Sequence, residues 1–270
     1  MTSSPCRGGG PLESAIMKEM SRRVFLLSSI AFPLGCTLAP SLVGGVPAPD
    51  ENPHPSVRGP KTGQWWRYAK RDAFTGKLVE VQVARVTEVD DTITIERRRE
   101  AAEEHQSWGT KWLHPDRRTG GEELLQAEVQ QPWGRILVDP HWDPLQVYST
   151  PIPLWPTELR AGWSSRFNTK FKTPLSADEN SWQQTMQAHT WEKIRVPAGE
   201  FLALRFTNRI TFTHADFSRM DSVREETLWF APDVGRWVSR RTSGTYYIRD
   251  SSIDTPFDEG SYHCDLLAWG

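Results

Sequence analysis

The chain has 270 residues, of which 37% are hydrophobic and 24% charged, and its formal net charge is −2. This composition is typical of a soluble globular protein with one large domain or two small ones, and the balanced charge argues against a nucleic-acid partner. The outlying feature is the presence of 13 tryptophans. Rings of this size can build a core where aliphatic residues are sparse, or line a groove for a sugar or a lipid.

An export signal is predicted near the N-terminus. The residues Val24–Leu34 form an apolar run that is too short to span a hydrocarbon core of about 30 Å. The preceding pattern S-R-R-V-F-L resembles the twin-arginine export consensus, which implies that the protein folds before it passes through that export machinery. An ordinary general-secretory signal is the alternative. The residues that match the consensus are Ser21, Arg22, Arg23, Phe25 and Leu26.

The apolar run ends in P-L-G-C, residues 33–36, which resembles a bacterial lipobox in its last two positions and departs from it in the first two. The resemblance implies that Cys36 receives a diacylglycerol and becomes the mature N-terminus, so that the protein binds a membrane through this lipid. The residue after the cysteine is Thr37 rather than Asp, which favours the outer membrane. A plain signal peptide, cleaved near Ala39 or Ala48, is the alternative.

These patterns divide the chain into four segments. Residues 1–19 are predicted to be an over-extended start, because a methionine at position 17 or 20 is a normal beginning for such a signal. Residues 20–36 form the signal peptide, and residues 37–60, rich in Pro, Gly and Ser, form a flexible tether. Residues 61–270 form one antiparallel β domain, in which G-Q-W-W-R-Y and G-W-S-S-R-F hint at two similar halves.

The three cysteines predict no intrachain disulfide. Cys6 precedes the expected start and Cys36 is the expected acylation site, which leaves Cys264 alone. We expect Cys264 to be a small buried hydrophobic residue on the last strand. Because no C-x-x-C motif or Cys/His cluster is present, neither a metal nor a cofactor is predicted.

From Gly63 onward the pattern becomes that of β-strands. Residues 77–89, K-L-V-E-V-Q-V-A-R-V-T-E-V, alternate between apolar and polar positions, and a turn at Asp90–Asp91 leads into T-I-T-I-E-R-R. Glu96–Gln106 is the one good helix candidate. It has no apolar stripe, which favours a solvated face or an extension of the hairpin. Arg97–Arg99 are followed by glutamates and are interpreted as part of this solvated face.

The middle of the chain, Gln131–Pro156, is interrupted by prolines, so that only short strands such as R-I-L-V are expected there. The C-terminal third contains the clearest strands. Turns at Pro197–Glu200 and Pro232–Gly235 join them into hairpins, because proline and glycine favour the backbone angles of tight turns. The predicted fold class is therefore mainly all-β: a curved antiparallel sheet or half-barrel with tight hairpins and at most one or two short helices.

Two motifs in this third carry a family resemblance. V-P-A-G-E-F at residues 196–201 and E-T-L-W-F-A-P-D-V-G-R-W-V at residues 226–238 resemble a signature of uncharacterised bacterial envelope lipoproteins. The resemblance covers roughly the last eighty residues well. It implies a curved antiparallel sheet or half-barrel and a non-catalytic envelope role, and it supplies no catalytic residues.

The search for catalytic motifs finds none. There is no G-x-S-x-G elbow, no H-E-x-x-H motif and no glycine-rich phosphate loop. The H-x-D motifs at His114–Asp116 and His141–Asp143 are interpreted as turn chemistry beside prolines. Glu225 and Glu226 point to opposite faces of a strand, so they cannot flank one glycosidic bond.

The tryptophans in loop-like stretches are the remaining functional lead. They either contact a ligand or lipid or plug the open ends of the curved sheet, because exposed rings are otherwise costly. These rings are Trp108, Trp112, Trp133, Trp142 and Trp155.

The sequence therefore predicts an exported, lipid-anchored, non-enzymatic protein on the periplasmic face of a bacterial membrane, with the outer membrane favoured. It binds an apolar or amphipathic ligand or an envelope partner. The first alternative is an enzyme acting on envelope glycan, or a carbohydrate-binding module, with Asp116, Asp139 or Asp143 as the acid of the enzyme. The second is a structural subunit of an envelope complex.

Overall fold

The described part of the chain consists of β-strands and their connections. The computed structural model describes residues 44–48, 55–100, 123–124, 127–141, 145–174, 176–249 and 255–270. Their strands are β1 (Val46–Pro47), β2 (Trp65–Asp72), β3 (Leu78–Val89), β4 (Ile93–Arg99), β5 (Glu123–Leu124), β6 (Glu128–Gln130), β7 (Arg135–Asp139), β8 (Gln146–Pro153), β9 (Ser164–Thr173), β10 (Ser176–Val196), β11 (Gly199–Phe212), β12 (Arg219–Ala231), β13 (Arg236–Ile248) and β14 (Phe257–Trp269). These ranges contain no helix, and hence none long and apolar enough to cross a membrane.

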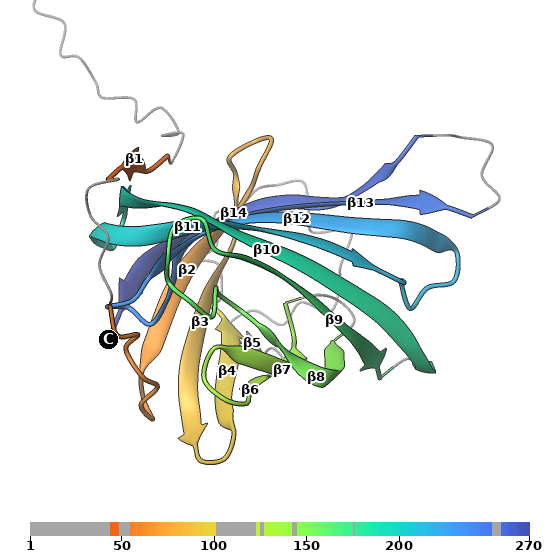
Figure 1. The fold of residues 1–270 in the computed structure, drawn as a ribbon, viewed down its shortest axis with the longest axis horizontal. Helices are drawn as coiled ribbons and strands as arrows, with labels where there is room; N and C mark the ends of the chain where they lie inside the picture. Colours follow the sequence, from red (N-terminus) through yellow and green to blue (C-terminus); the bar gives the residue numbers. More distant parts are fainter. Residues whose placement is uncertain are drawn as a thin grey trace, which may run out of the picture. The chain divides into compact units, whose positions relative to one another are not determined.

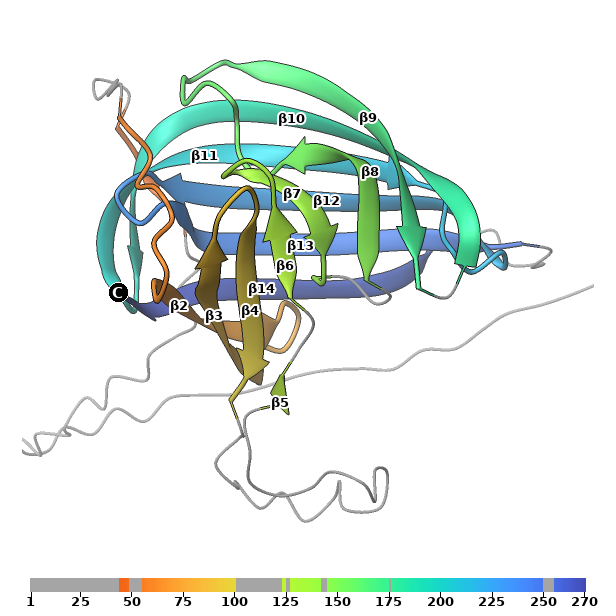
Figure 2. The same ribbon diagram turned by 90° about the horizontal axis from the view of Figure 1, so that it is seen from below.

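Twelve of these strands follow one another around a closed antiparallel barrel. The order is β10-β11-β12-β13-β14-β2-β3-β4-β6-β7-β8-β9, and β9 pairs back onto β10. Figure 2 shows the long strands β10–β14 on one side and the short strands β6–β8 on the other. The predicted all-β class is confirmed, and the curvature continues to full closure. Closure removes the exposed edges that an open sheet would present.

Strand length differs strongly around the barrel. β10 has 21 residues and β11–β14 have 13 or 14, whereas β6 has three residues and β7 five. In Figure 1 the long strands extend well beyond the short wall. The prolines of the middle region account for the short wall, because proline cannot donate a hydrogen bond to a neighbouring strand.

The predicted C-terminal hairpins are present. Val196 pairs with Gly199, so that Pro197 and Ala198 form the turn between β10 and β11. Residues 232–235 join β12 to β13, and Gly235 has a φ of 70° there, in the region that favours glycine. These two turns fix the register of the strands that form the long wall.

The helix candidate Glu96–Gln106 is a strand over its described part. β4 includes residues 96–99 and pairs with β3, which is the hairpin extension that the sequence left open, while residues 101–106 lie outside the described ranges. The prediction that Arg97–Arg99 form a solvated face is wrong for Arg97. Strand alternation turns its side chain into the barrel, where the residue is 7% exposed and donates a hydrogen bond to Gln82.

Two stretches of the predicted tether contact the barrel. β1 pairs with β10 at residues 192–193, and the Ala48 amide donates to the Trp191 carbonyl at 2.8 Å. The Arg58 amide donates to the Pro232 carbonyl at 2.9 Å, and the Arg58 carbonyl accepts from the Trp133 indole at 3.1 Å. These stretches therefore belong to the folded body.

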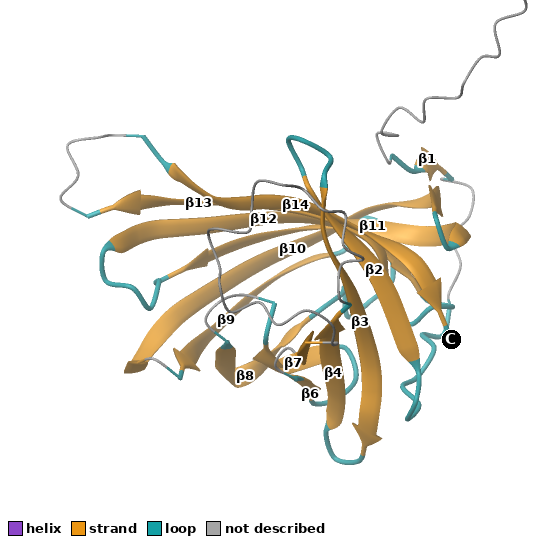
Figure 3. Cartoon of the chain, turned by 180° about the vertical axis from the view of Figure 1, so that it is seen from behind, coloured by secondary structure: helices purple, strands orange, loops and turns teal. Residues whose placement is uncertain are grey.

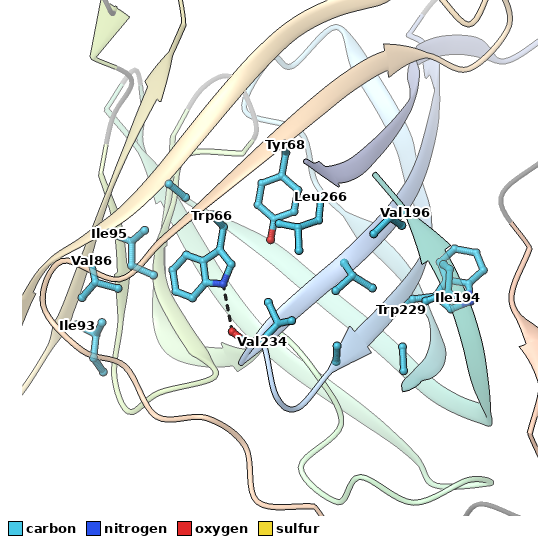
Figure 4. Close-up of a cluster of buried hydrophobic side chains, with 14 residues drawn as sticks. Trp66, Tyr68, Val86, Ile93, Ile95, Ile194, Val196, Trp229, Val234 and Leu266 are labelled. Atoms are coloured by element: carbon cyan, nitrogen blue, oxygen red, sulfur yellow. Dashed lines mark hydrogen bonds between the residues drawn. The ribbon is translucent and has the colours of Figure 1, made fainter. Parts of the chain in front are cut away.

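Three apolar clusters fill much of the barrel. The first, drawn in Figure 4, surrounds Trp66, whose indole donates to the Val234 carbonyl at 3.1 Å. The second includes Trp155 and Trp191, and the third is built around Trp182. Large rings thus supply much of the core volume, as the tryptophan content suggested.

Candidate binding site: a packed interior and a grooved outer face

Charged side chains share the barrel interior with these clusters. Arg236 donates to the Glu128 carboxylate at 2.6 Å, and its guanidinium lies over the Trp66 ring at 5.1 Å. Arg240 donates to Glu226, which also accepts from Asn208 at 3.1 Å. Each carboxylate also accepts a hydrogen bond from an amide side chain, Glu128 from Gln130 and Glu226 from Asn208, which helps to offset the cost of burying the charges. Within the described structure, Nε and Nη1 of Arg236 have no hydrogen-bond partner.

Asp139 and His141 form a second element of this polar interior. The Asp139 carboxylate accepts from the His141 backbone amide at 2.9 Å and lies 2.6 Å from Nδ1 of its ring. Burial raises the pKa of Asp139, but its interactions with His141 and the charge of Arg240 outweigh this effect and lower that pKa to about 2. Burial and the charge of Arg97 lower the pKa of His141. We therefore assign an ionised Asp139 beside a neutral imidazole at pH 7.

The cavity beside these groups is small. Its volume is about 40 Å³, and Asp139, His141, Glu226, Arg236 and Arg240 contribute to its wall together with apolar residues. A drug-sized ligand needs roughly 300–1,000 Å³, whereas 40 Å³ accommodates a few water molecules. This cavity, which lies beside the apolar clusters of the described interior, therefore has no room for a cargo molecule.

The cavity wall contains carboxylates but no hydroxyl, thiol or amine nucleophile among its described residues. Among the described residues that line the cavity there is no Ser, Thr, Cys or Lys that His141 could activate. The described residues contain no group of three or more His, Cys, Asp or Glu that could hold a metal ion. The described residues of this centre pair buried charges and leave space for a few water molecules.

The larger hollows lie on the outer face of the long wall. A hollow of about 550 Å³ crosses β10–β14, and we call it the threonine groove. A second hollow of about 1120 Å³ covers parts of β8–β12 and adjoins the first, because Thr211 lies beside Arg209 on β11. The hydroxyl-bearing residues that line the threonine groove are Thr185, Thr207, Thr227, Thr242, Ser243 and Ser261.

The hairpin between β2 and β3 forms one rim of the threonine groove. It rises from the sheet beside β14 in Figures 1 and 3, and its tip carries Phe74, which is 77% exposed. The Asp72 carboxylate fixes this tip by accepting from the amides of Phe74 at 3.1 Å and Thr75 at 2.7 Å. The hydrogen-bonded turn therefore presents a solvent-exposed aromatic residue at the edge of the groove.

The described tryptophans among the predicted ligand contacts lie in the core. Trp155 is 8% exposed and stacks on Phe230 with 4.7 Å between ring centroids. Trp133 is half-buried and meets Trp155 edge-on at 5.4 Å. Both rings therefore pack inside the barrel. This agrees with the second of the two roles proposed from the sequence, in which the tryptophans fill the sheet and do not contact a ligand.

Most of the other predicted site residues lie outside the described ranges. This group comprises Cys36, Ser21, Arg22, Arg23, Phe25, Leu26, Trp108, Trp112, Trp142, His114, Asp116 and Asp143. His141 pairs with Asp139, two residues before it, while Asp143 of the H-x-D motif lies outside the described ranges. Glu225 is exposed and Glu226 is buried, which confirms that they point to opposite faces.

Cys264 differs in part from the prediction. It lies on β14 as expected, opposite Arg240, and burial raises the pKa of its thiol, but the residue as a whole has intermediate exposure. Phe74 was not predicted as a site residue. The signal for it in the sequence is a lone aromatic residue in the turn D-A-F-T-G, where no core contact is available.

Stability should fall as the pH drops below about 6.5, the ordinary pKa of histidine. Burial is the first cause that lowers the pKa of His141, His189, His214 and His263. Because the unfolded chain then binds protons at a higher pH than the folded one, acid favours unfolding. We expect a lower urea midpoint at pH 5 than at pH 7.5. His141→Gln should remove more of this difference than His189→Gln, and a midpoint that rises on acidification would contradict the assignment.

Comparisons with known proteins leave the function open. No protein-family model and no curated protein sequence matches the chain. Its structure is similar to that of a lipoprotein candidate from Parabacteroides distasonis, with 12% identity, a TM-score of 0.46, and coverage of 81% of this chain and 100% of that one. It is also similar to an exported-protein candidate with a YmcC-like fold from Bacteroides fragilis, with 12% identity, a TM-score of 0.47, and coverage of 80% and 99%. Likeness at this level assigns no function.

Proposed function

We propose that this chain is an exported, lipid-anchored bacterial envelope protein that works by binding a partner or ligand on its outer surface. Binding on the outer surface is supported by the difference in volume between the interior cavity, about 40 Å³, and the threonine groove, about 550 Å³. A ligand of ordinary size fits the outer hollows and does not fit this interior cavity. The S-R-R-V-F-L pattern and the Gly-Cys pair that ends the apolar run support the export and the lipid anchor.

The competing enzyme hypothesis finds limited support. Of its three candidate acids only Asp139 lies in the described ranges, and there it is 6% exposed and paired with His141. A glycosidase needs two carboxylates on either side of a bond that substrate can reach. Asp139 and Glu226 both line the small cavity, which leaves no room for a sugar ring between them.

The lipid anchor is tested by mass and location. Expressed as the whole chain in a bacterium with twin-arginine export, the protein should appear in the membrane fraction with the intact mass of a species that begins at an acylated Cys36. Cys36→Ala should move it to the soluble fraction, because the acyl chains that hold it are gone. Cys264→Ala is the matched control. This variant should still carry the acyl modification and should still appear in the membrane fraction. Recovery of wild-type protein as a soluble species with an unmodified terminus after residue 36 would contradict the anchor.

A further inference from the structure

The floor of the threonine groove consists of two rows of outward side chains. In the first row, strand pairing places Thr185 beside Arg209, and Glu225 beside both Arg209 and Ser243. The second row lies two residues further along each strand and consists of Thr207, Thr227, Arg241 and His263. Hydroxyl groups, which both donate and accept hydrogen bonds, therefore recur across the whole width of the floor.

The charges on this floor leave a single positive group. Arg209 and Glu225 lie 3.0 Å apart and cancel each other. Burial and the neighbouring charge of Arg241 lower the pKa of His263, which favours the neutral ring at pH 7. The Arg241 guanidinium lies over the Trp229 ring at 5.1 Å, and within the described ranges no carboxylate forms an ion pair with it. The groove thus presents one stacked guanidinium among neutral polar groups.

Phe74 supplies an apolar platform at the rim. The Ala73 amide donates to the Ser261 carbonyl at 3.0 Å, which ties the base of the tip to β14. With the contacts of Asp72, this bond orders the backbone of the tip that carries the ring. An aromatic residue on an ordered turn loses less conformational entropy on binding than one on a flexible loop.

We propose that the threonine groove binds an acidic glycan. The proposal rests on the surface-binding role above and names its ligand class. A sugar chain has hydroxyls that match the floor, apolar C–H faces that stack on Phe74, and in acidic forms a carboxylate for Arg241. Each floor strand is already paired on both sides, so the groove offers no free edge to a peptide strand. The polar floor likewise does not fit an acyl chain.

The test uses the purified whole chain and soluble polymers as probes. Affinity electrophoresis should show retardation by two acidic glycans, alginate and polygalacturonate, weaker retardation by neutral dextran, and none by poly-glutamate, which has the charge without the sugar. Phe74→Ala should weaken alginate binding about fivefold or more, and Arg241→Gln about tenfold or more. Phe217→Ala is the matched control, because this ring is 83% exposed but does not line the groove, and it should bind as wild type.

Three results would overturn the inference: no retardation by either acidic glycan, equal binding of poly-glutamate, or equal effects of Phe74→Ala and Phe217→Ala. Dextran binding as tight as alginate would overturn its acidic part. Thermal melting of each variant verifies folding, and Phe74 lies on the surface, so its removal leaves the core intact. Because binding is measured on purified protein, failure here is separate from failure of the lipid anchor, which mass and location report.

Discussion

Replacing Glu128 with Gln is expected to lower the free energy of unfolding by about 3–5 kcal/mol, because it leaves the buried Arg236 without its carboxylate. Both side chains are almost completely removed from solvent. Glu128 also accepts from the Gln130 side chain at 2.6 Å, so its loss disturbs more than one contact. Urea unfolding at pH 7.5, followed by tryptophan fluorescence, measures the difference.

A matched variant at the surface shows how much of this loss of stability is due to burial of the ion pair and how much to the loss of a charge alone. Glu225→Gln removes the partner of Arg209, but that pair is more than half exposed, and its loss should cost less than about 1 kcal/mol. The double variant Glu128→Leu with Arg236→Met should recover much of the loss, since apolar replacement of a whole buried pair is often neutral or stabilising. Equal costs for Glu128→Gln and Glu225→Gln would show that burial does not govern the effect.

Gly235→Ala should destabilise the protein by about 3–4 kcal/mol, the sum of a backbone cost and a packing cost. Gly235 has a φ of 70°, and a Cβ there would lie 2.6 Å from the Arg58 carbonyl oxygen. That oxygen belongs to a segment held by Pro232 and Trp133, so it cannot retreat without breaking hydrogen bonds.

Gly76→Ala is the natural comparison for this change. Gly76 has nearly the same φ, 68°, but a Cβ there meets nothing within 4 Å. Its substitution should cost only the backbone part, about 1–2 kcal/mol. Thermal unfolding of both variants isolates the steric part as their difference. If the two glycines proved equally tolerant of alanine, the tight contact between Gly235 and the Arg58 segment would be refuted.

The long wall was predictable from sequence because its patterns are local. Alternation in residues 201–212 and the turn residues at 197–199 and 232–235 specify strands and hairpins without reference to the rest of the chain. The short wall was less predictable. β8 contains prolines, and β6 has only three residues, so neither gives a clear period-two signal. Their pairing depends on contacts that the barrel supplies when it closes.

The polar interior shows a different limit of sequence reasoning. Arg97 stands among charged neighbours that indicate a solvated surface, yet the strand turns it inward beside the charges of Glu128 and Asp139. Arg236 and Glu128 are far apart in the chain, so no local pattern joins them. A buried ion pair of this kind is visible only once the topology is known, and the same holds for the threonine groove, whose lining comes from five strands and a distant hairpin.

The pairing of β2 with β14 has a consequence for the timing of maturation. β14 ends at Trp269, which pairs with Trp66, and the bond from the Trp66 indole to Val234 already spans 168 residues. Such a topology has high contact order, which slows folding, and the ring of strands cannot close until β14 has been synthesised and reaches β2. Until β14 arrives, one edge of β2 and one edge of β13 have no partner strand and are open to wrong pairing. Removal of β14, residues 257–269, should therefore leave β2 and β13 each with one unpaired edge, and the shortened chain should aggregate or be degraded instead of closing into a barrel.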